Sequence, residues 1–125
     1  MDEDRYEQGL KQLESMAGPD GAKLMDSVAE ISPDLARYTI EFAFGDIYRR
    51  PGLDLRTRML ATVAALTAIG HAQPQLKANI GNALKVGCTR EEIQEVIIQM
   101  AVYAAFPAAL NGMFTAQEVF SEQDG

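Results

Sequence analysis

The feature that most constrains this chain is a series of sites where residues that end one helix are followed closely by residues that start the next. Segments with a helical spacing of apolar residues end in glycine or proline, and residues that can cap a new helix follow within a few positions. No segment alternates apolar and polar residues as a half-buried strand would, and no Asn-Gly or Asp-Gly turn lies between β-branched runs. The sequence therefore predicts an all-α protein.

Two of these signals are strong. In Ser32-Pro33-Asp34, the serine can cap backbone amides, while the proline and the aspartate suit the first helical turn. Thr89 and Glu92 can form a capping box just after a glycine that would end the preceding helix. We expect six or seven helices, near residues 6–17, 21–30, 33–48, 55–69, 74–86, 90–103 and 110–120.

Length and charge exclude several classes of protein. A chain of 125 residues suits one domain, spanning 1–125, with a modest core. Its 11 basic and 18 acidic residues give a net charge of -7, which would repel a nucleic-acid backbone. The apolar stretches 59–69 and 96–110 are too short or too interrupted to span a bilayer, and the acidic residues 2–4 are unlike the start of a signal peptide. We expect a cytoplasmic protein with neither nucleic acid nor membrane as a partner.

The single cysteine, Cys88, excludes an intrachain disulfide, a CxxC redox pair and a cysteine-rich zinc site, and we expect no metal. Two interpretations of this residue are open. It precedes the Thr89 cap, where a helix N-terminus can make a thiol reactive. With Ile93 five residues later, it also has the position of a hydrophobic staple, and we favour this structural role.

The C-terminal part of the chain carries more apolar surface than one helical partner could cover. The residues concerned are Ile97, Val102, Tyr103, Phe106, Phe114 and Phe120. Part of this surface is therefore expected to meet a second copy of the chain in a homo-oligomer. The alternative is that these side chains only fill the core of the monomer.

Several short motifs follow one another through most of the chain. They are residues 41–48 (EFAFGDIY), 50–54 (RPGLD), 57–58 (TR), 81–84 (GNAL), 87–93 (GCTREEI), 99–104 (QMAVYA) and 107–109 (PAA). In order and spacing they closely resemble the carboxymuconolactone decarboxylase family. The resemblance implies an all-α helical bundle of the alkylhydroperoxidase-D type. It also implies a homotrimer or homohexamer in which helices of neighbouring subunits pack together.

The chain departs from this family at two places that bear on chemistry. The redox branch of the superfamily has a CxxC pair on the helix that corresponds to 74–86, where this chain has none, so thiol-linked peroxidase activity is a weakened alternative. The decarboxylase branch has a histidine eight residues before the glycine of the Gly-x-Thr turn, and that position is Asn79. The missing histidine weakens decarboxylation and favours a catalytically silent member that binds a small ligand or a protein partner.

Decarboxylation of a carboxylated lactone or a related small acid needs no organic cofactor, because the electrons left by carbon dioxide can pass through a ring double bond into a carbonyl. The site must bind the remaining carboxylate, stabilise the oxyanion and deliver a proton to carbon. Arginine binds carboxylates through two hydrogen bonds, so Arg58 is the first candidate for this contact and Arg56 the second. Asn79 can polarise a carbonyl but cannot donate the proton, and it can equally satisfy a nearby backbone group.

Three residues are candidate proton donors: Asp46, Glu41 and His71, in that order. The two carboxyl groups lie on the largely apolar helix 33–48, where burial can bring a carboxyl group into the range useful for acid catalysis. His71, the only histidine, lies in a short connection and is favoured as a solvated loop residue.

Both carboxyl groups also have a simpler interpretation. Glu41 follows Arg37 by four residues and would form an ordinary surface ion pair, while Asp46 would meet Arg49 or Arg50. Since no other side chain is clearly placed to protonate carbon, we expect weak or absent turnover of 4-carboxymuconolactone.

Overall fold

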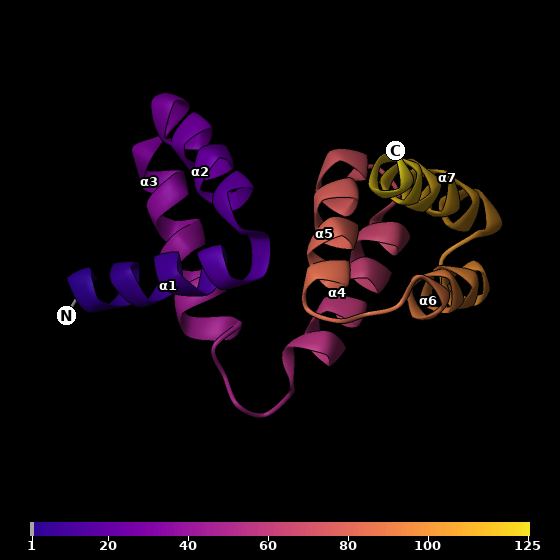
Figure 1. Cartoon of the computed structure of the whole chain (residues 1–125), viewed down its shortest axis with the longest axis horizontal. Helices are drawn as coiled ribbons and strands as arrows, with labels where there is room; N and C mark the ends of the chain where they lie inside the picture. Colours follow the sequence, from indigo (N-terminus) through magenta and orange to yellow (C-terminus); the bar gives the residue numbers. More distant parts are fainter. Residues whose placement is uncertain (1) are drawn as a thin grey trace. The chain divides into compact units, whose positions relative to one another are not determined.

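The computed structural model describes residues 2–125, with side chains from Asp4 onward, and its described residues form helices and connections (Figure 1). The helices are α1 (Asp2–Ala17), α2 (Pro19–Ile31), α3 (Pro33–Tyr38), η1 (Thr39–Ile47), α4 (Leu55–Ile69), α5 (Gln73–Lys85), α6 (Arg90–Tyr103) and α7 (Phe106–Asp124). The prediction of an all-α fold is confirmed. Packing divides the chain into two compact units, an N-terminal unit that ends at Leu53 and a C-terminal unit, Asp54–Gly125. The expectation of one domain stays a prediction.

The predicted helix starts are formed by the expected side chains. Ser32 Oγ accepts a hydrogen bond from the Leu35 amide at 3.2 Å and caps α3. At the start of α6, Thr89 Oγ1 accepts from the Glu92 amide at 3.0 Å, and Glu92 Oε1 accepts from the Thr89 amide at 2.8 Å. These bonds satisfy amides that have no partner inside the helix, so short sequence motifs determined where these two helices begin.

Three helices differ from their predicted form, and one of them, α1, begins at Asp2 rather than near residue 6. Helix α7 begins at Phe106 rather than near residue 110, because Pro107 lies in its first turn, where a missing N–H removes no helical hydrogen bond. The segment predicted as one helix over 33–48 is α-helical only to Tyr38 and continues as the π-helix η1. There the Tyr48 amide donates to the Ala43 carbonyl, five residues earlier, at 2.9 Å.

In the N-terminal unit, α1 packs across η1 at two glycines. A Cβ atom at Gly9 would collide with the Ile40 carbonyl oxygen, and one at Gly45 would lie 3.0 Å from the Arg5 carbonyl oxygen and 3.6 Å from the Gly9 Cα. The absence of side chains here lets the two helix backbones approach closely. Beside this crossing lies a core of Leu13, Ala17 and Ile40, with Leu10, Met25 and Phe44 packed against it.

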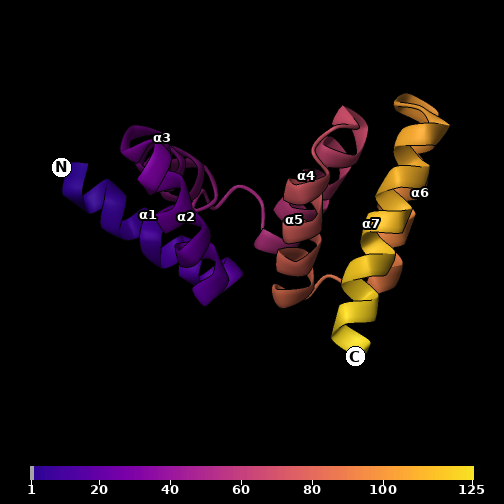
Figure 2. The same cartoon turned by 90° about the horizontal axis from the view of Figure 1, so that it is seen from above.

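In the C-terminal unit, α4 packs against α5 and α6, and α6 packs against α7 (Figure 2). Met59, Val63 and Thr67 lie four residues apart on α4, so they share one face, and all three are buried. Gly112 of α7 lies so close that a Cβ atom there would be 2.9 Å from the Thr67 Cγ2. Within residues 2–125, no helix is both long and apolar enough to cross a membrane.

The apolar residues of the C-terminal part of the chain, part of whose surface was predicted to meet another subunit, divide into two groups. Ile97 and Phe120 are buried inside the C-terminal unit, so these two belong to the part of the apolar surface that fills the core of the monomer. Val102, Tyr103, Phe106 and Phe114 are 70–80% exposed and form the exposed apolar set of α6 and α7. Homo-oligomerisation stays a prediction that rests on this second group.

Candidate functional site

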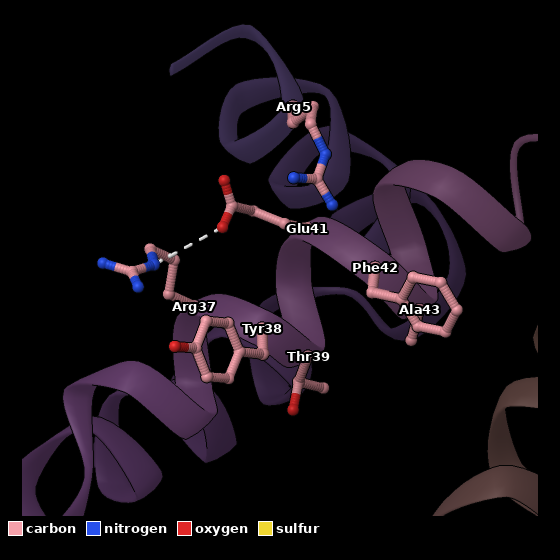
Figure 3. Close-up of a pocket in the computed structure, with 7 residues that line it drawn as sticks. All are labelled: Arg5, Arg37, Tyr38, Thr39, Glu41, Phe42 and Ala43. Carbon is pink, nitrogen blue, oxygen red and sulfur yellow. Dashed lines mark ion pairs between the residues drawn. The ribbon is translucent and has the colours of Figure 1, made fainter. Parts of the chain in front are cut away.

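A surface pocket of about 740 Å³ lies at the start of η1 in the N-terminal unit (Figure 3). Its lining combines two arginines, one carboxylate, two hydroxyl-bearing residues and two apolar residues. They are Arg5, Arg37, Tyr38, Thr39, Glu41, Phe42 and Ala43. Six of the seven come from the junction of α3 with the π-helix, a form of helix that occurs frequently at functional sites.

Glu41 is the unusual residue of this pocket, because its side chain is only 7% exposed. Its Oε1 lies 3.5 Å from Nε of Arg37, one helical turn earlier, so the predicted pair is present. The carboxylate is buried, however, rather than at the surface as the simpler interpretation required. A buried carboxylate is costly to keep charged unless it is paired, so Glu41 and Arg37 depend on each other.

Arg37 is held at the pocket by several contacts. Its guanidinium carbon lies 5.1 Å from the centre of the Tyr38 ring, and its Nη2 lies 3.5 Å from a carboxylate oxygen of Asp34. Half of its side chain remains exposed. Figure 3 shows the Glu41 carboxylate turned toward Arg37, and the Arg5 side chain reaching from α1 toward the same part of η1. The Arg37 guanidinium can therefore contact an anionic ligand in the pocket while it lies beside the Glu41 carboxylate.

Asp46 does not meet Arg49 or Arg50 as the sequence predicted. Its two carboxylate oxygens accept hydrogen bonds from Nε and Nη2 of Arg5, at 3.2 and 2.7 Å. Arg49 instead donates to the Gly45 carbonyl at 3.2 Å. Arg5 was missed in the sequence because 41 residues separate it from Asp46 and no local pattern connects them. Bound on both oxygens, Asp46 is better placed to hold Arg5 than to donate a proton.

Arg56, the second candidate for binding a carboxylate, is engaged in the C-terminal unit. Its Nη2 lies 2.6 and 2.7 Å from the two oxygens of Glu92, and its Nε donates to the Gly87 carbonyl at 3.1 Å. Hydrogen bonding to Glu92 raises the pKa of Arg56, while the Thr89 amide and then Arg56 lower the pKa of Glu92. Arg56 thus links the start of α4 to the start of α6.

Cys88 has the surroundings of a structural residue. The side chain is buried, as is Ile93, and its Sγ donates to the Arg56 carbonyl at 3.5 Å. Loss of hydration raises the pKa of the thiol, which leaves less of the nucleophilic thiolate at neutral pH. Its burial and raised pKa favour the staple interpretation over a reactive thiol.

The other predicted site residues lie in the C-terminal unit. Arg58 is partly buried in the first turn of α4, and Asn79 Nδ2 donates to the Gln75 carbonyl at 2.8 Å, one turn earlier on α5. His71 is exposed after the C-cap of α4 and lines a second pocket, of about 540 Å³, that also contains Glu118. Substrate contacts by these three residues stay predictions. Among the described residues, no cluster of His, Cys, Asp and Glu could hold a metal ion.

Comparison with known proteins found a matching family and several proteins of similar sequence. The sequence profile of the carboxymuconolactone decarboxylase family matches residues 33–118. A 4-carboxymuconolactone decarboxylase of Acinetobacter baylyi is 32% identical over 122 residues, which cover 97% of this chain and 90% of the relative. An uncharacterized 15.0 kDa protein of Paracoccus denitrificans is 37% identical over 101 residues, 80% of this chain and 75% of the relative.

A third relative comes from a fungus. It is a nitrosuccinic acid decarboxylase of Metarhizium robertsii, 32% identical over 83 residues, which cover 66% of this chain and 57% of the relative. Within the pocket, Arg37 and Glu41 lie inside the residues that match the family, whereas Arg5 precedes them. The segment that the family profile matches therefore carries the buried carboxyl group and one of the two arginines, and the alignment with the Acinetobacter baylyi relative extends over the other arginine as well.

Proposed function

The chain belongs to the carboxymuconolactone decarboxylase family, and from that premise we propose that it decarboxylates a small carboxylic acid, without an organic cofactor, at the pocket of Arg37 and Glu41. The single observation that carries this proposal is the buried Glu41 carboxyl group beside a half-exposed arginine. Two relatives whose names describe decarboxylases support it. The substrate class is a carboxylated lactone or a similar acid with a carbonyl that can take up electrons.

The reaction breaks one carbon–carbon bond and consumes one proton. The substrate carboxylate leaves as carbon dioxide, its bonding electrons pass into the conjugated carbonyl, and a proton is then added to carbon. Arg37 binds an anionic oxygen of the substrate, and Glu41 donates the proton and takes another from water. A substrate oxygen at Arg37 competes with Glu41 for that partner.

Glu41 is chosen over the other candidate donors because of their surroundings. Both oxygens of Asp46 are occupied by Arg5, and His71 is exposed in the C-terminal unit. Arg58 lies in the C-terminal unit and outside this pocket, so its predicted substrate contact belongs to a different site. The buried Cys88 thiol, with its raised pKa, does not favour the peroxidase alternative.

The test is carbon dioxide release from a panel of small carboxylated lactones and keto acids by the purified protein. Glu41→Gln keeps the size of the side chain but removes the acid, so we expect turnover to fall by about 10²- to 10⁴-fold. The matched control is Glu7→Gln, an exposed carboxylate of α1 in the same unit, with turnover unchanged. Release of no carbon dioxide from any member of the panel would favour the silent, ligand-binding alternative.

Asn79 supplies a second arm of this test. We expect slow turnover of 4-carboxymuconolactone by the unaltered protein, because Asn79 stands where the family has a histidine. If the reaction instead takes place in the C-terminal unit, Asn79→His should raise that turnover and Arg58→Ala in the same background should lower it through weaker substrate binding, whereas Glu41→Gln should leave it unchanged. Efficient turnover before any substitution would show that the histidine is dispensable here.

A further inference from the structure

Two exposed aromatic side chains line the pocket that contains Glu41. Tyr38 and Phe42 are 56% and 59% exposed, and both belong to the pocket lining. Phe44, only two residues after Phe42, instead packs against the core of the N-terminal unit and stacks on Tyr48, with 5.5 Å between the ring centres. The core therefore uses Phe44 and leaves Tyr38 and Phe42, which we name the aromatic pair, open to a ligand.

The charged and the apolar side chains of this pocket lie at different places along it. Figure 3 shows the Arg37 guanidinium beside the Glu41 carboxylate, and the Phe42 ring next to Ala43, further along η1. The Tyr38 ring is near both, because its centre lies 5.1 Å from the Arg37 guanidinium carbon and Phe42 follows it by one helical turn. A ligand with an anionic group at Arg37 can therefore place its remaining atoms against the aromatic pair.

The pocket also has room for more than a small anion. Its volume of about 740 Å³ lies in the range of sites that bind drug-sized molecules. Every carboxylate can form an ion pair with Arg37, so this pair by itself distinguishes poorly between one acid and another. Covering exposed aromatic surface with apolar ligand atoms is favourable in water. Selectivity then comes from the part of the acid that meets the aromatic pair.

We propose that Tyr38 and Phe42 are the specificity-determining residues of this pocket, and that its substrate is an amphipathic acid with an anionic group at Arg37 and an apolar chain or ring against the aromatic pair. This inference rests on the proposed function, because it names the substrate class of the same pocket. The apolar part is remote from the reacting carbon, so it changes KM more than kcat.

The test is calorimetric titration of the full chain with butyrate, hexanoate and octanoate, which share one carboxylate and differ only in apolar length. The affinity should rise by about two- to fourfold for each added methylene. Phe42→Ser should remove this dependence on length while the affinity for butyrate stays within about twofold. The matched control is Leu24→Ser, at a 53% exposed apolar residue of α2 outside the pocket lining, which should change neither quantity.

Further variants separate the anionic group of the ligand from its apolar part. Arg37→Gln should weaken the binding of all three acids by the same factor and leave the gain per methylene unchanged. Tyr38→Ser should lower both quantities, because its ring contacts Arg37 and belongs to the aromatic pair, whereas Tyr38→Phe keeps the ring and both quantities. Helical circular dichroism checks that each variant folds. If Arg37→Gln does not fold, Arg37→Lys, which keeps the charge without the planar guanidinium, gives the same comparison.

An affinity that does not rise with chain length, or a rise that persists in folded Phe42→Ser, overturns the inference. A changed assembly mass in Phe42→Ser with an unchanged dependence on length also overturns it, because the aromatic pair would then be a contact between subunits. The 3-keto acids of the same lengths test the reaction, and their kcat/KM should rise with length through a lower KM. If binding depends on length and on Phe42 but no acid is decarboxylated, the proposed function fails and the inference stands. If all lengths are decarboxylated equally well, only the inference fails.

Discussion

The two units of the chain use glutamate in opposite ways. Glu92, in the C-terminal unit, is 37% exposed and is bound by the Thr89 amide and by Arg56 at 2.6 Å. Glu41, in the N-terminal unit, is 7% exposed and lies 3.5 Å from Arg37. The first is satisfied at a helix cap, while the second is buried beside a pocket with a looser pair. A carboxylate is therefore a candidate catalytic group because of its burial and its neighbours, and not because of its position on a helix.

The units also differ in what they leave exposed, and this gives the prediction with the largest expected effect. Val102, Tyr103, Phe106 and Phe114 of α6 and α7 are 70–80% exposed, so we predict that the C-terminal unit carries the interface of a homotrimer or homohexamer. Light scattering at micromolar concentration should find no dominant monomer, and Phe106→Glu should produce one. Ile31→Glu, at an 89% exposed residue of the N-terminal unit, should leave the mass unchanged. A monomeric unaltered protein would refute the prediction.

Glycine-to-alanine substitutions should change the free energy of unfolding in opposite directions at the close helix crossing of the N-terminal unit and at Gly81 of the C-terminal unit. Gly9→Ala places a methyl group against the Ile40 carbonyl and is expected to lower the free energy of unfolding by about 1–3 kcal/mol. Gly81→Ala, inside α5 with nothing within 4 Å of the new Cβ, should raise it by about 0.5–1 kcal/mol. Urea denaturation measures both values. Equal effects at the two sites would mean that α1 and η1 are not in close contact.

A smaller effect, which depends on pH, is expected at Glu92. The Thr89 amide and Arg56 lower its pKa from 4.5 in the folded protein, so its ionised form contributes stability above pH 4.5. That contribution is lost as the pH falls through the lowered folded pKa. Glu92→Gln should therefore lower Tm at pH 7, and the difference from the unaltered protein should shrink below pH 4.5. Glu95→Gln, at an exposed residue of the same helix, should show no such trend.

The smallest effect is expected at Cys88. Because its thiol is buried and has a raised pKa, Cys88→Ala should cost no more than about 1 kcal/mol and leave any decarboxylation unchanged. Thermal denaturation and carbon dioxide release measure the two quantities. A peroxide-dependent turnover that disappears in the folded variant would instead restore the peroxidase alternative.

Helix caps are the part of this structure that the sequence predicted best. Ser32, Thr89 and Glu92 each bond to a residue three positions away, so the interaction can be found in a short window of sequence. The pair of Arg37 and Glu41 was found in the same way, four residues apart, but its burial was not. Whether a side chain on a helix is buried depends on which element covers it, and a helical spacing does not contain that information.

The sequence by itself determined the all-helical class, most helix boundaries, the family and the structural interpretation of Cys88, because these depend on local hydrogen bonds and on motifs read in order. Only the tertiary structure decided that Asp46 binds Arg5, that Glu41 is buried, and that Ile97 and Phe120 belong to the core. The physical reason is chain separation. Arg5 and Asp46 are 41 residues apart and meet only because two glycines, themselves distant in sequence, let α1 pack against η1.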